Sequence, residues 1–181
     1  RVAIAIIREE CPEAKISLGG VAGFCHGFAR LGADELRKKE KQDLFLGAVK
    51  ALAREVDVIG WHPFYQADPD SARVREYGQD VRALQAWCEA QGFRGDYMAT
   101  EYAWGANYPA PVKPNWWGEF VCSELQKAKY VARLSVQHTG LGVGSYFCTV
   151  WGSTTYPLDL SLMRRGFNAD PFTPIQPQAA Y

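Results

Sequence analysis

Apolar residues recur three and four positions apart in four stretches of the chain, the spacing that gives a helix one buried face. The clearest stripe is Val74, Tyr77, Val81, Leu84 and Cys88. The other predicted helices cover residues 2–10, about 35–54 and about 119–138. In the same order, the residues expected on their buried sides are Ala3, Ile6, Ile7 and Cys11; Leu44, Phe45, Ala48, Val49, Leu52 and Ala53; and Val121, Leu125, Ala128, Ala132 and Ser135.

Short apolar runs separate these helices and have the length and composition of buried strands. They occupy residues 15–20, 57–60, 97–100 and 144–150. Strands that alternate with helices of crossover length form a parallel sheet with right-handed connections. The pattern therefore predicts an α/β fold built from parallel β/α units.

Four β/α units amount to half of a (β/α)8 barrel, whose usual length is about 250 residues. The chain has 181 residues and begins with a helix that no strand precedes. A complete four-stranded sheet would instead need cover on both edges. We therefore expect residues 1–181 to form a single partial domain, the second half (strands five to eight) of a TIM barrel.

Charge and composition argue against several classes of partner. Twenty basic residues balance twenty acidic ones, with no long run of either sign, so neither nucleic acid nor a membrane surface is expected. No apolar run is long enough to span a bilayer. The five cysteines include no Cys-x-x-Cys pair and are expected to be buried free thiols. Free thiols favour a cytoplasmic location, but a leader could precede Arg1, so the compartment stays open.

The acidic residues differ in where they lie on the predicted strands. Asp57 and Asp96 stand at strand starts and are expected to be structural, whereas Glu101 stands at a strand finish. Parallel α/β sheets and barrels keep their chemistry at the strand finishes. Glu101 is therefore the candidate catalytic residue, and the alternative is an ion-pair partner. The loop after it is rich in residues that can stack on or hydrogen-bond sugars: Tyr102, Trp104, Asn107, Tyr108, Trp116 and Trp117.

His62 also follows a strand, near Trp61 and Tyr65, and could hold the Glu101 carboxylate in position. Trp61, Tyr65 and Tyr146 are further candidates for contact with the carbohydrate. His26 and His138 are expected to be hydrogen-bonded structural residues. Trp151 ends the last strand, and it forms either the floor or wall of the same pocket or part of the core.

Other catalytic motifs are missing from the sequence. It contains no Gly-x-Ser-x-Gly elbow and no phosphate-binding Gly-x4-Gly-Lys-Ser/Thr loop, and Leu18-Gly-Gly-Val-Ala-Gly23 lacks the spacing of a dinucleotide site. No His-x3-His or Cys/His cluster indicates zinc. We expect neither a metal nor a cofactor.

These motifs resemble the large clan of (β/α)8 retaining glycosidases. Lys15–Gly20 would be its strand five, and strands six to eight would carry Asp57-Val-Ile-Gly-Trp-His62-Pro-Phe-Tyr65, Thr100-Glu101-Tyr-Ala-Trp104 and Tyr146–Trp151. The ending Pro174-Ile-Gln-Pro-Gln-Ala-Ala-Tyr181 is similar to the Pro-x-x-Tyr-rich segment that follows strand eight.

The resemblance implies a role for particular residues. Glu101 matches the nucleophile, His62 the strand-six histidine near the catalytic centre, and Trp151 the aromatic residue beneath the reacting sugar. The strand-six tyrosine of the clan often lies two residues after the histidine. That position holds Phe64 here, and Tyr65 is one place later.

The departure from the clan concerns the general acid/base, which is the Glu of an Asn-Glu pair at the end of strand four. No Asn-Glu dipeptide occurs in this chain, and Glu119 and Glu124 fall on a predicted helix. Retaining hydrolysis needs two carboxyl groups about 5–5.5 Å apart. The chain is therefore expected to carry half of the catalytic machinery.

Three functional hypotheses follow. The first is a retaining glycoside hydrolase acting on β-linked glycosides or polysaccharides, with the acid/base supplied by preceding residues or by another chain. The second is a non-catalytic half-barrel that binds carbohydrate, as a monomer or as a dimer that completes a barrel. The third is an unrelated small α/β enzyme, which would be favoured if Glu101 and His62 lay on different faces.

Overall fold

The computed structural model describes residues 1–22, 25–38, 40–63, 70–102 and 123–147, together with the short strands at 163–164 and 173–174. Its helices are α1 (Val2–Glu10), α2 (Phe28–Leu36), α3 (Glu40–Leu52), α4 (Ala72–Arg75), α5 (Tyr77–Ala90) and α6 (Glu124–Gly140). Its strands are β1 (Ser17–Ala22), β2 (Val58–His62), β3 (Asp96–Tyr102), β4 (Val143–Phe147), β5 (Met163–Arg164) and β6 (Thr173–Pro174).

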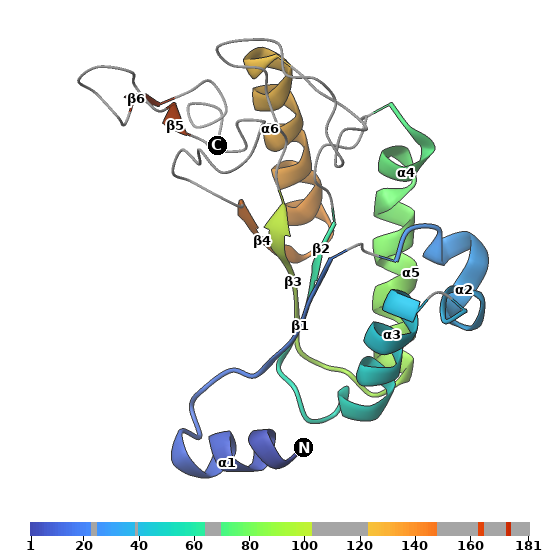
Figure 1. Ribbon diagram of the computed structural model, residues 1–181, viewed down its shortest axis with the longest axis vertical. Helices are drawn as coiled ribbons and strands as arrows, with labels where there is room; N and C mark the ends of the chain where they lie inside the picture. Colours follow the sequence, from blue (N-terminus) through green and yellow to red (C-terminus); the bar gives the residue numbers. More distant parts are fainter. Residues whose placement is uncertain are drawn as a thin grey trace.

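Strands β1 to β4 form one sheet in chain order, and every neighbouring pair is parallel. Helices α5 and α6 pack against the same face of it, because side chains of β2 and β3 reach both helices. Figure 1 shows α1 apart from the other helices, at the end where the strands start. The predicted α/β class and parallel sheet are confirmed. Strands β5 and β6 pair antiparallel.

The predicted stripe on α4 and α5 is confirmed, since Val74, Tyr77, Val81, Leu84 and Cys88 are all buried. The two helices meet at Glu76, which ends one and begins the next. They pack on the aromatic and aliphatic residues that β2 and β3 turn toward them. This stripe therefore forms the centre of the core.

The other predicted faces were wrong in part. Leu44 is 74% exposed and Leu125 is 54% exposed, and Ile6 on α1 is also exposed. The sides that do pack inward carry Phe45, Leu46, Val49 and Ala53 on the α3 side and Lys127, Ala128, Val131, Leu134 and His138 on α6. Apolar spacing allows several adjacent faces on one helix, and only contact with the sheet selects among them.

Helix α2 is held to α5 by a buried carboxylate. Both oxygens of Asp80 accept main-chain hydrogen bonds, from Gly27 at 2.7 Å and from Ala29 at 2.9 Å. Gly27 is the N-cap of α2, and Ala29 lies in its first turn, where helical N–H groups have no partner within the helix. The single long helix predicted over residues 35–54 is instead two helices, since α2 ends at Leu36 and α3 begins at Glu40.

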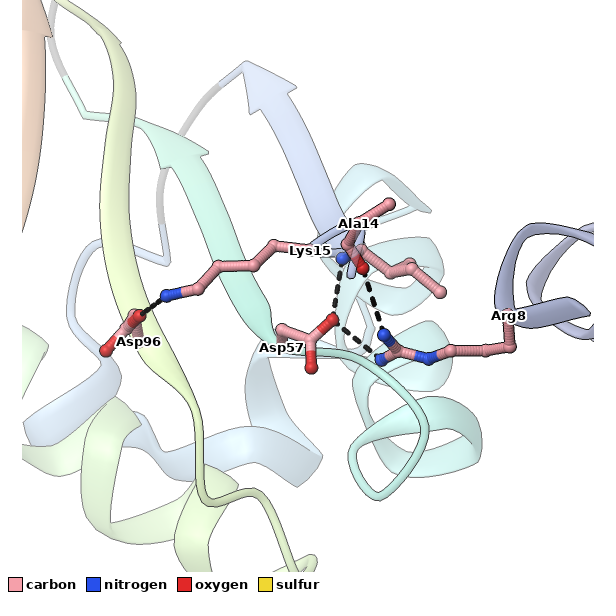
Figure 2. A network of polar contacts seen from close by, with 6 residues as sticks. Arg8, Ala14, Lys15, Asp57 and Asp96 are labelled. Atoms are coloured by element: carbon pink, nitrogen blue, oxygen red, sulfur yellow. Dashed lines mark hydrogen bonds and ion pairs between the residues drawn. The ribbon is translucent and has the colours of Figure 1, made fainter. Parts of the chain in front are cut away.

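The edge where the strands start is joined by ionic contacts (Figure 2). Asp57 accepts hydrogen bonds at 2.7 Å from the main-chain N–H of Ile16 and from the guanidinium of Arg8, which also donates to Ala14 O. Lys15 Nζ lies 2.8 Å from Asp96 Oδ2. The Ile16 amide, followed by Arg8, lowers the pKa of Asp57. The predicted placement of Asp57 and Asp96 at strand starts is confirmed, and both carboxylates contact cationic side chains there.

In the part of the chain that the structure describes, no helix combines the length and the apolar character that crossing a bilayer requires.

Candidate active site

The edge where the strands finish brings the two predicted site residues together. His62 is the last residue of β2, and Glu101 lies near the end of the adjacent β3. His62 Nδ1 is 3.2 Å from Glu101 Oε2, and the two side chains are 17% and 36% exposed. The pair therefore presents a carboxylate to solvent while its orientation is held from the neighbouring strand.

A bulge in β3 turns Glu101 toward His62. Ala99 pairs with Ser145 and Tyr102 pairs with Phe147, so three steps along β3 correspond to two along β4. Residues three apart on a regular strand face opposite sides, yet Ala99 and Tyr102 are both fully buried. The extra residue lets both of them remain in the core and re-aims the residues between them, as bulges do beside active sites.

A second bulge lies in β1 at Gly20. Gly19 pairs with Gly60 and Val21 pairs with Trp61, which leaves Gly20 without a paired residue on β2. Gly20 has φ of +91°, and a Cβ placed on it would lie 3.6 Å from His62 Nε2. The imidazole therefore extends across β2, with Nε2 toward β1 and Nδ1 toward β3.

Thr100 fits against the backbone of β2 because residue 60 is a glycine. A Cβ on Gly60 would lie 2.8 Å from Thr100 Cγ2. The Thr100 hydroxyl donates a 3.3 Å hydrogen bond to Trp61 O, immediately before His62. Thr100 precedes Glu101 and Trp61 precedes His62, so this hydrogen bond links the two strands just before the two site residues.

Trp61 and Tyr102 lie in the core rather than at the open edge. Both are fully buried. Trp61 Nε1 donates to Tyr77 Oη at 3.1 Å, and the Tyr102 hydroxyl lies 2.9 Å from Ser135 Oγ. Consecutive strand residues point to opposite faces, so these neighbours of His62 and Glu101 face the helices. Their predicted contact with sugar stays a prediction, and their burial favours a packing role.

Tyr146 in β4 is 61% exposed. It lies three positions after the buried Val143, which places it on the sheet face opposite the helices, the face that His62 also uses. Its predicted contact with substrate stays a prediction. The other predicted binding residues lie outside the described part of the chain: Tyr65, Trp104, Asn107, Trp116, Trp117 and Trp151.

The other two histidines make structural contacts. His26 Nε2 lies 3.2 Å from Pro63 O. His138 is fully buried, with Nε2 2.8 Å from Tyr77 Oη, and burial lowers its pKa to about 4. His138 therefore stays neutral at physiological pH.

The described cysteines Cys11, Cys25 and Cys88 are free thiols. The last two are buried, and burial raises the pKa of each to about 12. Cys122 and Cys148 lie outside the described residues. A search of the described residues finds no group of three or more His, Cys, Asp or Glu side chains arranged to hold a metal ion.

Gly20 and Thr100, which shape the site, and Tyr77, which lies behind it, were not among the predicted site residues. The glycine run at 18–23 was the only signal for the β1 bulge, and nothing in the sequence located the β3 bulge. The third hypothesis, an unrelated enzyme, loses support because Glu101 and His62 are in contact.

No protein-family model matches the chain, and no curated protein sequence matches it. Among solved structures, the chain is similar to the crystal structure of a mutant GH128 (subgroup I) endo-beta-1,3-glucanase from Amycolatopsis mediterranei in complex with laminarihexaose. The match has a TM-score of 0.54 and 19% sequence identity, and it covers 91% of this chain. It covers only 56% of the glucanase chain. The residues described here therefore share an α/β fold with about half the length of that enzyme.

Proposed function

We propose that residues 1–181 are the second half of a (β/α)8-barrel retaining glycoside hydrolase in which Glu101 is the nucleophile. The observation that carries this proposal is the contact between His62 Nδ1 and Glu101 Oε2 at the strand-finish edge of a parallel sheet. This edge is where parallel α/β folds place their chemistry. The one-sided helical cover of the described sheet is also that of a barrel wall.

The chemistry assigns complementary roles to the two side chains. Glu101 attacks the anomeric carbon, the bond to the leaving oxygen breaks, and a glycosyl ester forms that water then hydrolyses. For a hydrogen bond to the carboxylate, His62 Nδ1 must carry a hydrogen. His62 then restricts rotation of the carboxylate and keeps it in an attacking orientation.

The general acid/base belongs, in this proposal, to residues outside positions 1–181, on the same polypeptide or on another chain. Strands β1 to β4 contain two acidic residues, Asp96 and Glu101, and Asp96 lies at the opposite edge of the sheet. A carboxyl group about 5–5.5 Å from the nucleophile is needed to protonate the leaving oxygen. The glucanase chain extends well beyond the matched part, which leaves room for a counterpart of the missing half.

The proposed substrate is a β-linked glucan, and a β-1,3-linked one is the first to test. This choice comes from the similarity to an endo-beta-1,3-glucanase. The exposed Tyr146, on the same sheet face as His62, offers an aromatic surface for a sugar ring.

A mechanism-based label tests the nucleophile without requiring the acid/base. We would incubate the chain with a 2-deoxy-2-fluoro β-glucoside or laminaribioside that carries a dinitrophenolate leaving group, which departs without protonation. The fluorine slows hydrolysis of the ester, so the glycosyl-enzyme accumulates. Intact-mass measurement and peptide mapping are expected to find one sugar on Glu101.

Two variants serve as controls for the label. Glu101→Gln is expected to remain unlabelled, whereas Asp96→Asn, which alters the other end of the same strand, is expected to be labelled like the parent chain. Labelling at another residue, or equal labelling of Glu101→Gln, would overturn the assignment. Binding of a β-glucan without any label would instead favour the non-catalytic half-barrel.

A further inference from the structure

A buried cluster lies directly behind the His62–Glu101 pair. It consists of Trp61, Tyr77, Tyr102, Ser135 and His138, and its strand members are the residues next to His62 and Glu101. Trp61, Tyr77, Tyr102 and His138 are all fully buried. The cluster therefore connects the ends of β2 and β3 to helices α5 and α6.

Two polar links run through this cluster. The first passes from Trp61 Nε1 to Tyr77 Oη at 3.1 Å and from Tyr77 Oη to His138 Nε2 at 2.8 Å. The second joins Tyr102 Oη to Ser135 Oγ at 2.9 Å, and Ser135 also donates to Val131 O. Each link attaches one strand end to a helix.

His138 contacts both links. Its ring lies edge-on to Tyr77, with centroids 5.6 Å apart, and edge-on to Tyr102, with centroids 5.5 Å apart. Trp61, which precedes His62, contacts Tyr77, and Tyr102, which follows Glu101, contacts His138. Among the described residues His138 Nδ1 has no hydrogen-bond partner, so this ring is held by the Nε2 contact with Tyr77 and by its packing on Tyr77 and Tyr102.

We infer that Tyr77 and His138 are positioning residues for the His62–Glu101 contact: they hold the finishes of β2 and β3 from the helical side. The inference rests on the proposed function only for its effect on catalysis. The geometric part concerns an imidazole–carboxylate contact that exists whatever reaction the site performs. A small misplacement of such a contact has a large effect, because about 1 Å can cost about a hundredfold in rate.

Tyr77→Phe is the test variant, since it keeps the ring and removes only the hydroxyl shared with Trp61 and His138. Tyr97→Phe is its matched control. The Tyr97 hydroxyl is also bound to α5, donating to Gln85 O at 3.1 Å, but it stands near the start of β3, four residues before Glu101. Both variants are expected to lower the urea midpoint to a similar extent.

The readout is the nitrogen NMR spectrum of the His62 ring in the chain labelled with nitrogen-15. Glu101→Gln, which removes the carboxylate, is expected to move the His62 Nδ1 signal and so defines the shift caused by losing the contact. Tyr77→Phe should move this signal in the same direction, whereas Tyr97→Phe should leave it in place. An unmoved His62 signal in Tyr77→Phe, or equal shifts in the two variants, would overturn the inference.

The kinetic consequence separates this inference from the proposed function. With the fluoro-glycoside label, Tyr77→Phe should slow ester formation at saturating reagent about tenfold with little change in the concentration giving half-maximal rate. Tyr97→Phe should match the parent chain. If the parent chain forms no ester but the NMR shifts occur as stated, the proposed function fails and the positioning role stands.

Discussion

The two edges of the parallel sheet use carboxylates in opposite ways. Where the strands start, Asp57 and Asp96 are bound to the cations Arg8 and Lys15, and Asp57 also accepts a main-chain hydrogen bond. Where the strands finish, Glu101 lies beside the imidazole of His62. A guanidinium or ammonium group carries a permanent charge at neutral pH, whereas an imidazole can orient a carboxylate without one. The carboxylates at the strand starts are therefore paired with permanent cations, whereas Glu101, the proposed nucleophile, is paired with a titratable ring.

The backbone differs between the edges as well. At the strand starts the pairing is regular, with Ser17 opposite Val58 and Val58 opposite Asp96. Near the finishes both β1 and β3 contain a bulge. Regular pairing at the strand starts keeps that edge of the sheet uniform. Bulges near the strand finishes redirect side chains there, where the candidate site lies.

The largest effect should come from replacing the carboxylates of β3, one at a time, by the corresponding amides. Glu101→Gln is expected to lower the release of dinitrophenolate from an activated β-glucoside by on the order of 10³-fold or more, since it removes the proposed nucleophile. Asp96→Asn should leave this rate within about twofold of the parent chain. A large loss in Asp96→Asn with a native circular dichroism spectrum would contradict the division between the edges.

The edges should also respond to acid in different pH ranges. His138, behind the finish edge, has its pKa lowered to about 4 by burial, from 6.5. Its contribution to stability is complete above pH 6.5 and is lost as the pH falls toward 4, because only the unfolded chain takes up the proton. The loss in unfolding free energy should reach about 3 kcal/mol, as 1.36 kcal/mol accompanies each pKa unit.

Urea unfolding at pH 7 and pH 4.5 measures this effect. His138→Gln is expected to be less stable than the parent chain at pH 7, because it disturbs the contact with Tyr77, and to lose less on acidification. Equal pH dependence in the two proteins would show that His138 does not carry the effect.

His62→Ala should slow formation of the glycosyl ester by about ten- to a hundredfold, since it leaves the nucleophile present but free to rotate. The matched change at the other edge is Lys15→Ala, which removes the partner of Asp96. It should leave the labelling rate unchanged. The rate is followed by intact mass, and a similar slowing in both variants would mean that general destabilisation, not orientation, is responsible.

The smallest effect is expected from Asp57→Asn at pH 7. The folded-state pKa of Asp57 is lowered, so its contribution is present above the unfolded value of about 3.9 and is lost as the pH falls through the folded value. The variant should therefore unfold at a slightly lower urea concentration at pH 7, and the difference from the parent chain should shrink as the pH is lowered below the unfolded value. A difference that persists unchanged at pH 3 would exclude the carboxylate charge as its cause.

Much of the fold could be predicted because the relevant signals are local. Four helices alternating with four apolar runs were sufficient for a parallel α/β sheet, and the stripe from Val74 to Cys88 lies in the core as expected. The faces of α3 and α6 were misassigned at Leu44 and Leu125, because spacing alone does not choose among adjacent helical faces. Lys127 is the clearest example, because it is fully buried although its side chain ends in an ammonium group, and a pattern of apolar residues does not predict that.

For the candidate site, the sequence by itself determined which residues stand at the finishes of β2 and β3, and so it located Glu101 and His62 there. Only the tertiary structure decided that they touch, that bulges in β1 and β3 aim them, and that Trp61 and Tyr102 face the core. The reason is that strand position is read along the chain, whereas a bulge depends on how two strands pair. One inserted residue reverses which face the following side chains use, and nothing in the local pattern records it.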